Sequence, residues 1–213
     1  MSRVNLAQTE RAGLVEALRR AGPDAPTLCA GWNTRDLAVH ILLRERRVDA
    51  TAGMFLPPLA AWTGRVTRQY RDRDYAELLA DIADGPPWYS PLALPDKYVN
   101  LAEMFVHHED VLRGAADPAG TWAARGLPTG LDDALVLPLK TVGRLTMGKS
   151  PAEVTLATPD GRVLLTAGKG APVTVTGAVG ELVLFAFGRA PVDVVLTGDD
   201  EAVARVLGAS RSL

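Results

Sequence analysis

The chain has 213 residues, of which 47% are hydrophobic and 23% charged, with a net charge of −2. This composition is typical of a globular protein with one large domain or two smaller ones. The absence of net positive charge argues against nucleic-acid binding, and no apolar stretch is long enough to span a bilayer. The N-terminus lacks the apolar run of a signal peptide, and a single cysteine, Cys29, excludes an internal disulfide. A cytoplasmic protein without membrane or nucleic-acid partners is expected; the oligomeric state stays open.

Helical periodicity dominates the first two-thirds of the chain. The first helix is expected to end at Gly22, and the second to begin at Asn33, whose side chain can cap it, with Asp36 in the first turn. The fifth carries Pro138 and is expected to be kinked or to begin with an irregular turn. The expected helical regions are 5–22, 33–48, 60–85 with a break near 72–74, about 97–115, and 128–148.

After residue 148 the hydrophobic pattern changes to the period of two that is typical of strands. "AEVTLAT" and "RVLLTAG" flank Pro159-Asp160-Gly161, a hairpin turn in which proline presets φ and glycine tolerates positive φ. Further strands are expected in "VTVTG" and "VDVVLTG", and helices in "AVGELVLFAFG" and "DEAVARVLGA". The fold class is therefore α+β, with a helical bundle over 1–148 and a small α+β domain over 149–213.

The three histidines of the chain lie in two helical segments. Glu103 and His107 are four residues apart and so share one helix face. His40 lies among apolar residues of the second helix, and neighbouring helices pack about 8–10 Å apart, so the three side chains can meet. Two histidines and a glutamate with an open fourth position are the ligand set of a catalytic zinc site. The alternative is that these are core histidines with satisfied hydrogen bonds; His108 points about 100° away and is expected near the site's edge or at the surface.

The segments "LCAGWNTRDLAVHIL" and "EMFVHHEDVLRG" resemble the mycothiol-dependent maleylpyruvate isomerase family, within the DinB-like superfamily of metal-binding bundles. The resemblance implies an up-down DinB-like bundle in which His40, Glu103 and His107 bind a divalent metal, usually zinc. "GELVLFAFGRAP" and "VVLTGD" resemble the family's small C-terminal domain, which is related to sterol-carrier folds. The residues that match the two motifs are Gly31, Trp32, Asp36, Leu37, His40, Glu103, His107 and Asp110.

The resemblance also implies a chemistry. The cosubstrate would be mycothiol, the thiol that replaces glutathione in actinobacteria, and the partners a small-molecule thiol and an electrophilic substrate. The expected function is a metal-dependent transferase or isomerase in which the His/Glu/His site activates the thiol. The alternative, from another class, is a non-catalytic small-ligand-binding protein whose metal is structural or lost.

Three further residues have both a functional and a structural interpretation. Arg189 matches a family arginine that is implied to reach the bundle site and hold a carboxylate, or it is a solvated helix-end arginine. Asp110 can accept a hydrogen bond from a liganding histidine and fix its tautomer, or it is a surface charge that pairs with Arg113 or Arg44. Cys29 is interpreted as a structural cysteine rather than a nucleophile, because no further histidine is present to act as its base.

Overall fold

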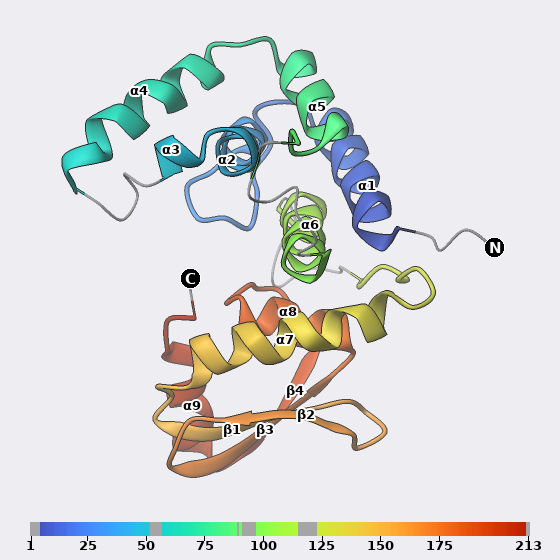
Figure 1. The fold of residues 1–213 in the computed structure, drawn as a ribbon. Coiled ribbons are helices and arrows are strands. Elements are labelled where there is room, and N and C mark those ends of the chain that lie inside the picture. The colour runs from blue at the N-terminus through green and yellow to red at the C-terminus, as the bar shows by residue number, and fades with distance from the viewer. Residues whose placement is uncertain (1–4, 52–56, 89, 91–96, 115–122, 212–213) are drawn as a thin grey trace. The chain divides into compact units, whose positions relative to one another are not determined.

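The computed structural model describes residues 5–51, 57–88, 90, 97–114 and 123–211. The chain has two compact units, 1–115 and 116–213. The first is helical and the second combines helices with a four-stranded sheet, which confirms the α+β class (Figure 1). Within the described residues, no helix is long and apolar enough to cross a membrane.

The helical unit is built around the pair α1 and α6, which pack along each other. Helix α5 packs against both α1 and α2, and α4 packs against α2 (Figure 1). Its elements are α1 (Leu6–Ala21), α2 (Thr34–Arg46), α3 (Val48–Thr51), the 3₁₀ turn η2 (Pro57–Leu59), α4 (Ala60–Arg71), α5 (Tyr75–Asp84) and α6 (Lys97–Leu112).

Local signals set the helix ends of this unit. Asn33 caps the start of α2, as the sequence predicts, and the Asp36 side chain in turn accepts from the Asn33 N–H, which completes a capping box. Gly22 ends α1 with φ of 78°, a conformation that favours glycine. The polar third region breaks as expected, because the Asp74 side chain accepts from the N–H groups of Ala76 and Glu77 and starts α5 as a separate helix.

The second unit contains a sheet with strand order β2-β1-β3-β4, in which β1 and β3 are parallel and the outer pairs antiparallel. Helices α7 and α8 pack against each other on one side of this sheet (Figure 1). The predicted hairpin is confirmed: Thr158 N–H donates to the carbonyl of Arg162, and Gly161 has φ of 87°. The elements are α7 (Leu131–Met147), β1 (Ala152–Ala157), β2 (Val163–Ala167), β3 (Ala171–Gly177), α8 (Val179–Ala186), β4 (Val194–Gly198) and α9 (Asp200–Gly208).

Helix α7 explains why the units divide at 115/116, whereas the change of periodicity predicts a boundary at 148/149. It is helical, yet it packs against α8 and β2 of the second unit. Its buried side chains include Leu135 and Leu139, and Pro138 lies inside one continuous helix that follows a turn closed by Leu131 N–H and the Pro128 carbonyl. Periodicity reports the local conformation of a segment but not the core that the segment joins.

Candidate metal centre

The side chains of His40, Glu103 and His107 meet between α2 and α6 of the helical unit. Each offers one ligand atom, and these atoms lie within 4.8 Å of one another. The His40 and His107 rings meet edge to face with centroids 5.5 Å apart, and Trp32 packs on His40 with centroids 5.0 Å apart. The i, i+4 spacing on α6 leaves Glu103 Oε1 3.9 Å from His107 Nε2. The structure thus brings together the three residues that the sequence selects as metal ligands.

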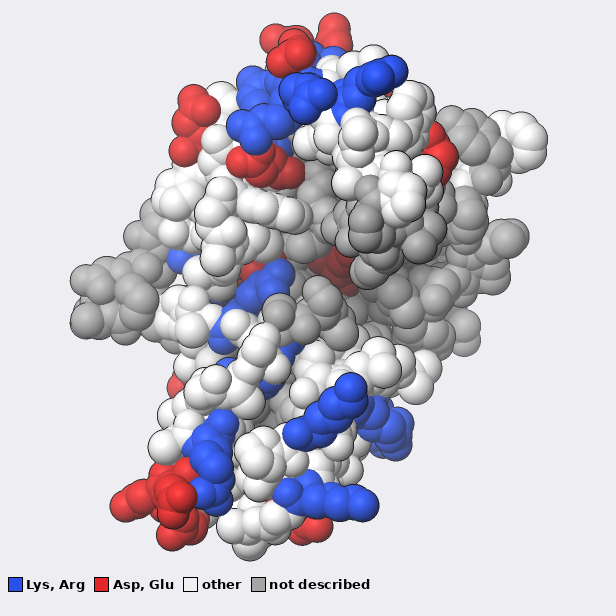
Figure 2. All heavy atoms as spheres, turned by 90° about the vertical axis from the view of Figure 1, so that its left-hand side faces the viewer, with Lys and Arg blue, Asp and Glu red and all other residues white. Residues whose placement is uncertain are grey.

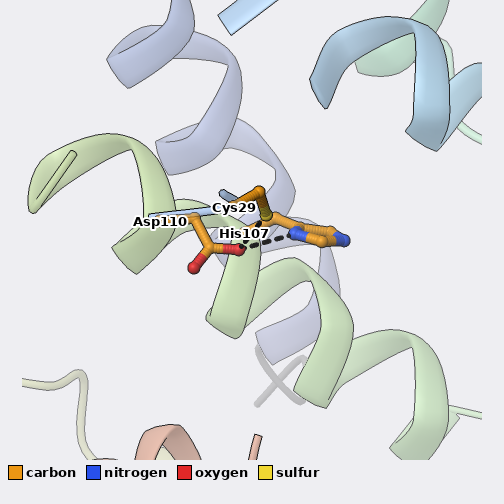
Figure 3. A group of neighbouring side chains, drawn as sticks. All are labelled: Cys29, His107 and Asp110. Carbon is orange, nitrogen blue, oxygen red and sulfur yellow. Dashed lines mark hydrogen bonds and ion pairs between the residues drawn. The ribbon is translucent and has the colours of Figure 1, made fainter. Parts of the chain in front are cut away.

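A second group lies on the other side of the His107 ring and contains Cys29 and Asp110 (Figure 3). Asp110 Oδ2 is 3.0 Å from His107 Nδ1 and accepts from the Cys29 thiol at 3.1 Å. The Asp110 side chain has no exposed surface. The loop that carries Cys29 is held to α6 because Leu28 N–H donates to the Asp110 carbonyl at 3.0 Å. Asp110 is therefore a buried acceptor and not a surface charge.

Distances between donor atoms distinguish the two groups. Two ligands bound at about 2.1 Å to a tetrahedral zinc lie about 3.4 Å apart, and a sulfur ligand lies farther still from its neighbours. The 3.0 and 3.1 Å separations at Asp110 Oδ2 are shorter than that and are hydrogen-bond lengths. The 3.9 Å between Glu103 and His107 leaves room for an ion. The donor set of His40, Glu103 and His107 therefore fits a metal, whereas Cys29 and Asp110 form a hydrogen-bonded support behind it.

The hydrogen bond to Asp110 decides which ring nitrogen of His107 carries the proton. When Nδ1–H donates to Asp110, the lone pair of the neutral ring is on Nε2, which faces Glu103. A carboxylate in this position is the common partner of a metal-binding histidine and fixes both its tautomer and its ring orientation.

Arg44 also belongs to the site, although the sequence alone suggested it only as a possible partner of Asp110. It follows His40 by one helical turn, and its NH1 forms an ion pair with Glu103 Oε2. The side chains of Arg44 and Glu103 are 21% and 18% exposed. The sequence shows that Arg44 lies one turn after His40 on the same helix face, but the register of α2 against α6, which brings Arg44 to Glu103, depends on tertiary packing.

Other candidate residues have structural partners. His108 is buried, and its Nδ1 is 3.1 Å from Glu10 Oε2 on α1, so the interpretation as a surface residue is wrong. In the second unit, Arg189 NH1 donates to the carbonyl of Phe187 at 2.9 Å and its N–H to Leu184, beside the end of α8. These contacts do not test a role of Arg189 in binding a substrate.

Many charged side chains of the helical unit lie in ion pairs. Several of its arginines are paired with carboxylates, among them Arg46 with Asp81 and Arg73 with both Asp81 and Glu77. Figure 2 shows side chains of both signs of charge, together with uncharged residues, on one face of the molecule.

Comparison with known proteins agrees with this fold. Residues 4–142 match the model of the mycothiol maleylpyruvate isomerase N-terminal domain, and the chain therefore belongs to this family. Two crystal structures, of the mycothiol-dependent maleylpyruvate isomerase and of a histidine mutant of it, have TM-scores of 0.54 and 0.59. Each is 15% identical, and the match covers 90% of both chains, so the likeness shows a shared fold. No curated protein sequence matches the chain.

Proposed function

We propose that the protein is a metal-dependent, mycothiol-using transferase or isomerase that acts on a small electrophilic substrate. The observation that carries the proposal is the convergence of His40, Glu103 and His107, with ligand atoms within 4.8 Å, in a chain of this family. Two imidazole nitrogens and one carboxylate oxygen are a known ligand set of catalytic zinc sites, and zinc is the metal that we propose. Mycothiol is an intracellular thiol, so the proposal places the reaction in the cytoplasm.

A divalent metal with an open coordination position lowers the pKa of a bound thiol and presents it as a thiolate near neutral pH. The residues of the chain do the rest. His40 and His107 supply neutral imidazoles, and Asp110 holds the Nδ1–H of His107 at 3.0 Å. The Cys29 thiol donates to the same carboxylate oxygen, which keeps Asp110 oriented although it is fully buried. In this proposal, Asp110 assists catalysis through the tautomer of His107.

The thiol acts as the nucleophile in either reaction. In an isomerisation it adds to a conjugated double bond, the adduct rotates about the resulting single bond, and the thiol is expelled with return of the double bond. In a transfer it displaces a leaving group, which takes the electron pair of the broken bond, and the thiol remains attached. Arg189 is proposed to bind a carboxylate of the substrate, for which a planar guanidinium is suited.

The test combines metal analysis with turnover. Purified protein loaded with Zn²⁺ is expected to hold one ion per chain. The His40→Ala variant is expected to lose the ion, because the two protein ligands that remain bind Zn²⁺ only weakly. His108→Gln serves as the control, since this histidine contacts Glu10 and should leave the metal in place. The loaded protein is then incubated with mycothiol and a set of electrophiles such as conjugated unsaturated acids and alkyl halides.

The outcomes separate the candidate functions. Consumption of an electrophile that depends on both metal and mycothiol supports the enzyme. Stoichiometric metal and thiol binding without turnover favours the non-catalytic binding protein instead. Wild-type protein that takes up no metal, or His40→Ala protein that keeps it, contradicts the proposed site.

A further inference from the structure

We infer that Arg44 is a positioning residue that makes Glu103 present a single carboxylate oxygen to the metal and so keeps a coordination position open for the thiol. The inference rests on the proposed function, because it concerns the geometry of that metal site. It assigns a task to a residue outside the set of ligands.

The contacts of the two Glu103 carboxylate oxygens support this role of Arg44. Its two carboxylate oxygens have different neighbours: Oε2 pairs with Arg44 NH1, while Oε1 faces His107 Nε2 at 3.9 Å. Arg44 reaches Glu103 from α2, one turn after His40, so the same two helices supply both the ligands and the guanidinium. With both side chains about four-fifths buried, the pair is shielded from much of the solvent screening that weakens exposed pairs.

The chemistry of carboxylates explains why this contact matters. A glutamate can bind a divalent metal through one oxygen or through both, and the second oxygen occupies space that another ligand needs. Carboxylate ligands are in turn held by hydrogen bonds from neighbouring groups, which fix their orientation. With Arg44 on Oε2, binding through both oxygens requires the loss of a charge-assisted hydrogen bond. Arg44 thereby favours three protein ligand atoms and one open position.

A matched arginine lies two residues farther along α2. Arg46 pairs with Asp81 at 3.2 Å, and the side chains of this pair are 22% and 24% exposed, much like those of Arg44 and Glu103. Its NH2 also donates to the backbone carbonyls of Asp81 and Gly85, so it ties α2 to the end of α5. Removing Arg46 therefore reports the structural cost of losing a largely buried arginine of α2 without changing the contacts of Glu103.

The experiment uses the full chain loaded with Co²⁺, whose visible absorption is strong in four-coordinate sites and weaker in five-coordinate ones. Wild type, Arg44→Met, Arg44→Lys and Arg46→Met are compared for Co²⁺ content, for this spectrum, and for binding of N-acetylcysteine through its sulfur-to-cobalt charge-transfer band. Arg44→Met is expected to keep its cobalt, to show the weaker five-coordinate spectrum, and to bind the thiol about tenfold more weakly.

The two other variants complete the test. Arg44→Lys should lie between wild type and Arg44→Met, because an ammonium pairs with Oε2 as a point charge without the planar fork. Arg46→Met should lower the melting temperature but leave spectrum and thiol affinity unchanged. If Arg44→Met does not fold, Arg44→Gln, which keeps a hydrogen-bond donor but no charge, is judged by the same spectrum and titration.

Failure of the inference and failure of the proposed function give different results. An unchanged spectrum and thiol affinity in the Arg44 variants, in a protein whose wild type binds cobalt and thiol, overturns the positioning role alone. Loss of cobalt from Arg44→Met also overturns it, because the arginine would then be needed for metal binding rather than for its geometry. A wild type that binds no cobalt overturns the proposed function and this inference together.

Discussion

The two units bury different kinds of side chains. Among the described residues, the helical unit buries seven ionisable side chains, whereas the α+β unit buries one, Glu181, which accepts from the Asp193 N–H. A buried charge is costly unless it is paired and hydrogen-bonded, so an interior of this kind needs a reason. The buried ionisable side chains of the helical unit are Glu10, Glu45, His107, His108, Glu109, Asp110 and Arg113.

The arrangement of these charges suggests the reason. His107 and Asp110 belong to the candidate metal centre, and their neighbours on and just after α6 pair within the bundle: His108 with Glu10, and Arg113 with Glu109 at 2.7 Å. The α+β unit instead packs apolar residues of α7 and α8 beside its sheet. The helical unit therefore buries paired ionisable side chains around the candidate metal centre, whereas the described core of the α+β unit contains almost none. Four experiments test this difference.

The largest effect is expected from a buried ion pair that does not include the candidate ligands. Arg11 on α1 pairs through both guanidinium nitrogens with Glu45 on α2, whose side chain is 1% exposed. Glu45→Gln leaves Arg11 without its counter-charge and should lower the free energy of unfolding by about 3 kcal/mol in chemical denaturation. The double variant Arg11→Met, Glu45→Leu should lie within about 1 kcal/mol of wild type, because an apolar pair avoids desolvation. A double variant as unstable as the single one would mean that the charges themselves hold the bundle.

The next effect tests whether the α+β unit takes part in the chemistry. Arg189→Ala should leave Zn²⁺ content unchanged and weaken binding or turnover of a carboxylate substrate about ten- to a hundredfold, the value of one charge-assisted hydrogen bond of about 1.5–3 kcal/mol. The control is Arg205→Ala, which removes an exposed arginine of the same unit that pairs with Glu201. Kinetics with an identified acidic substrate measure both. Equal values for wild type and Arg189→Ala would confine the chemistry to the helical unit.

Two glycine-to-alanine variants, one in each unit, compare how rigid the interiors of the helical unit and the α+β unit are. An added Cβ at Gly13 would meet the His108 ring, and one at Gly143 would meet the end of the Leu165 side chain, both closer than van der Waals contact. Alanine favours a helix over glycine by about 1 kcal/mol. Leu165 can turn away, so Gly143→Ala should be nearly neutral; His108 is held by Glu10, so Gly13→Ala should cost about 1–2 kcal/mol. Thermal denaturation of both variants measures the loss of stability. Equal losses for Gly13→Ala and Gly143→Ala would contradict the view that the polar interior of the helical unit is the more rigid one.

The smallest effect comes from an exposed ion pair of the helical unit. The Arg47 guanidinium, helped by the Trp62 N–H, lowers the pKa of Asp49 from 3.8 to about 2. Because the folded-state pKa is depressed, the pair stabilises the protein above pH 4, and this contribution is lost as the pH falls toward about 2. With Asp49 53% exposed, Asp49→Asn should cost less than about 1 kcal/mol at pH 6, and the difference should shrink at pH 3. Denaturation at the two pH values measures it, and a difference that grows at pH 3 would refute the sign.

Much of the fold can be predicted because its signals are local. The capping box of Asn33 and Asp36, the stop at Gly22 and the turn at Gly161 each act within a few residues, and the structure has all three. The two motifs likewise select His40, Glu103 and His107, since residues four apart on a helix share a face whatever surrounds it. Whether these residues hold a metal stays a prediction that elemental analysis can test.

The sequence by itself predicted most of the helices and strands and several of their ends, because hydrophobic period and capping chemistry depend on near neighbours. It selected the three candidate ligands through their placement on helices and through the family resemblance. Tertiary structure decided which groups from distant segments meet. The Cys29 thiol donates to Asp110, which lies 81 positions later in the sequence, and Arg44 on α2 pairs with one carboxylate oxygen of Glu103 on α6. It also decided that α7 joins the sheet although its pattern continues that of the bundle. Such choices depend on which apolar faces bury one another and which charges find partners, and no local pattern encodes either.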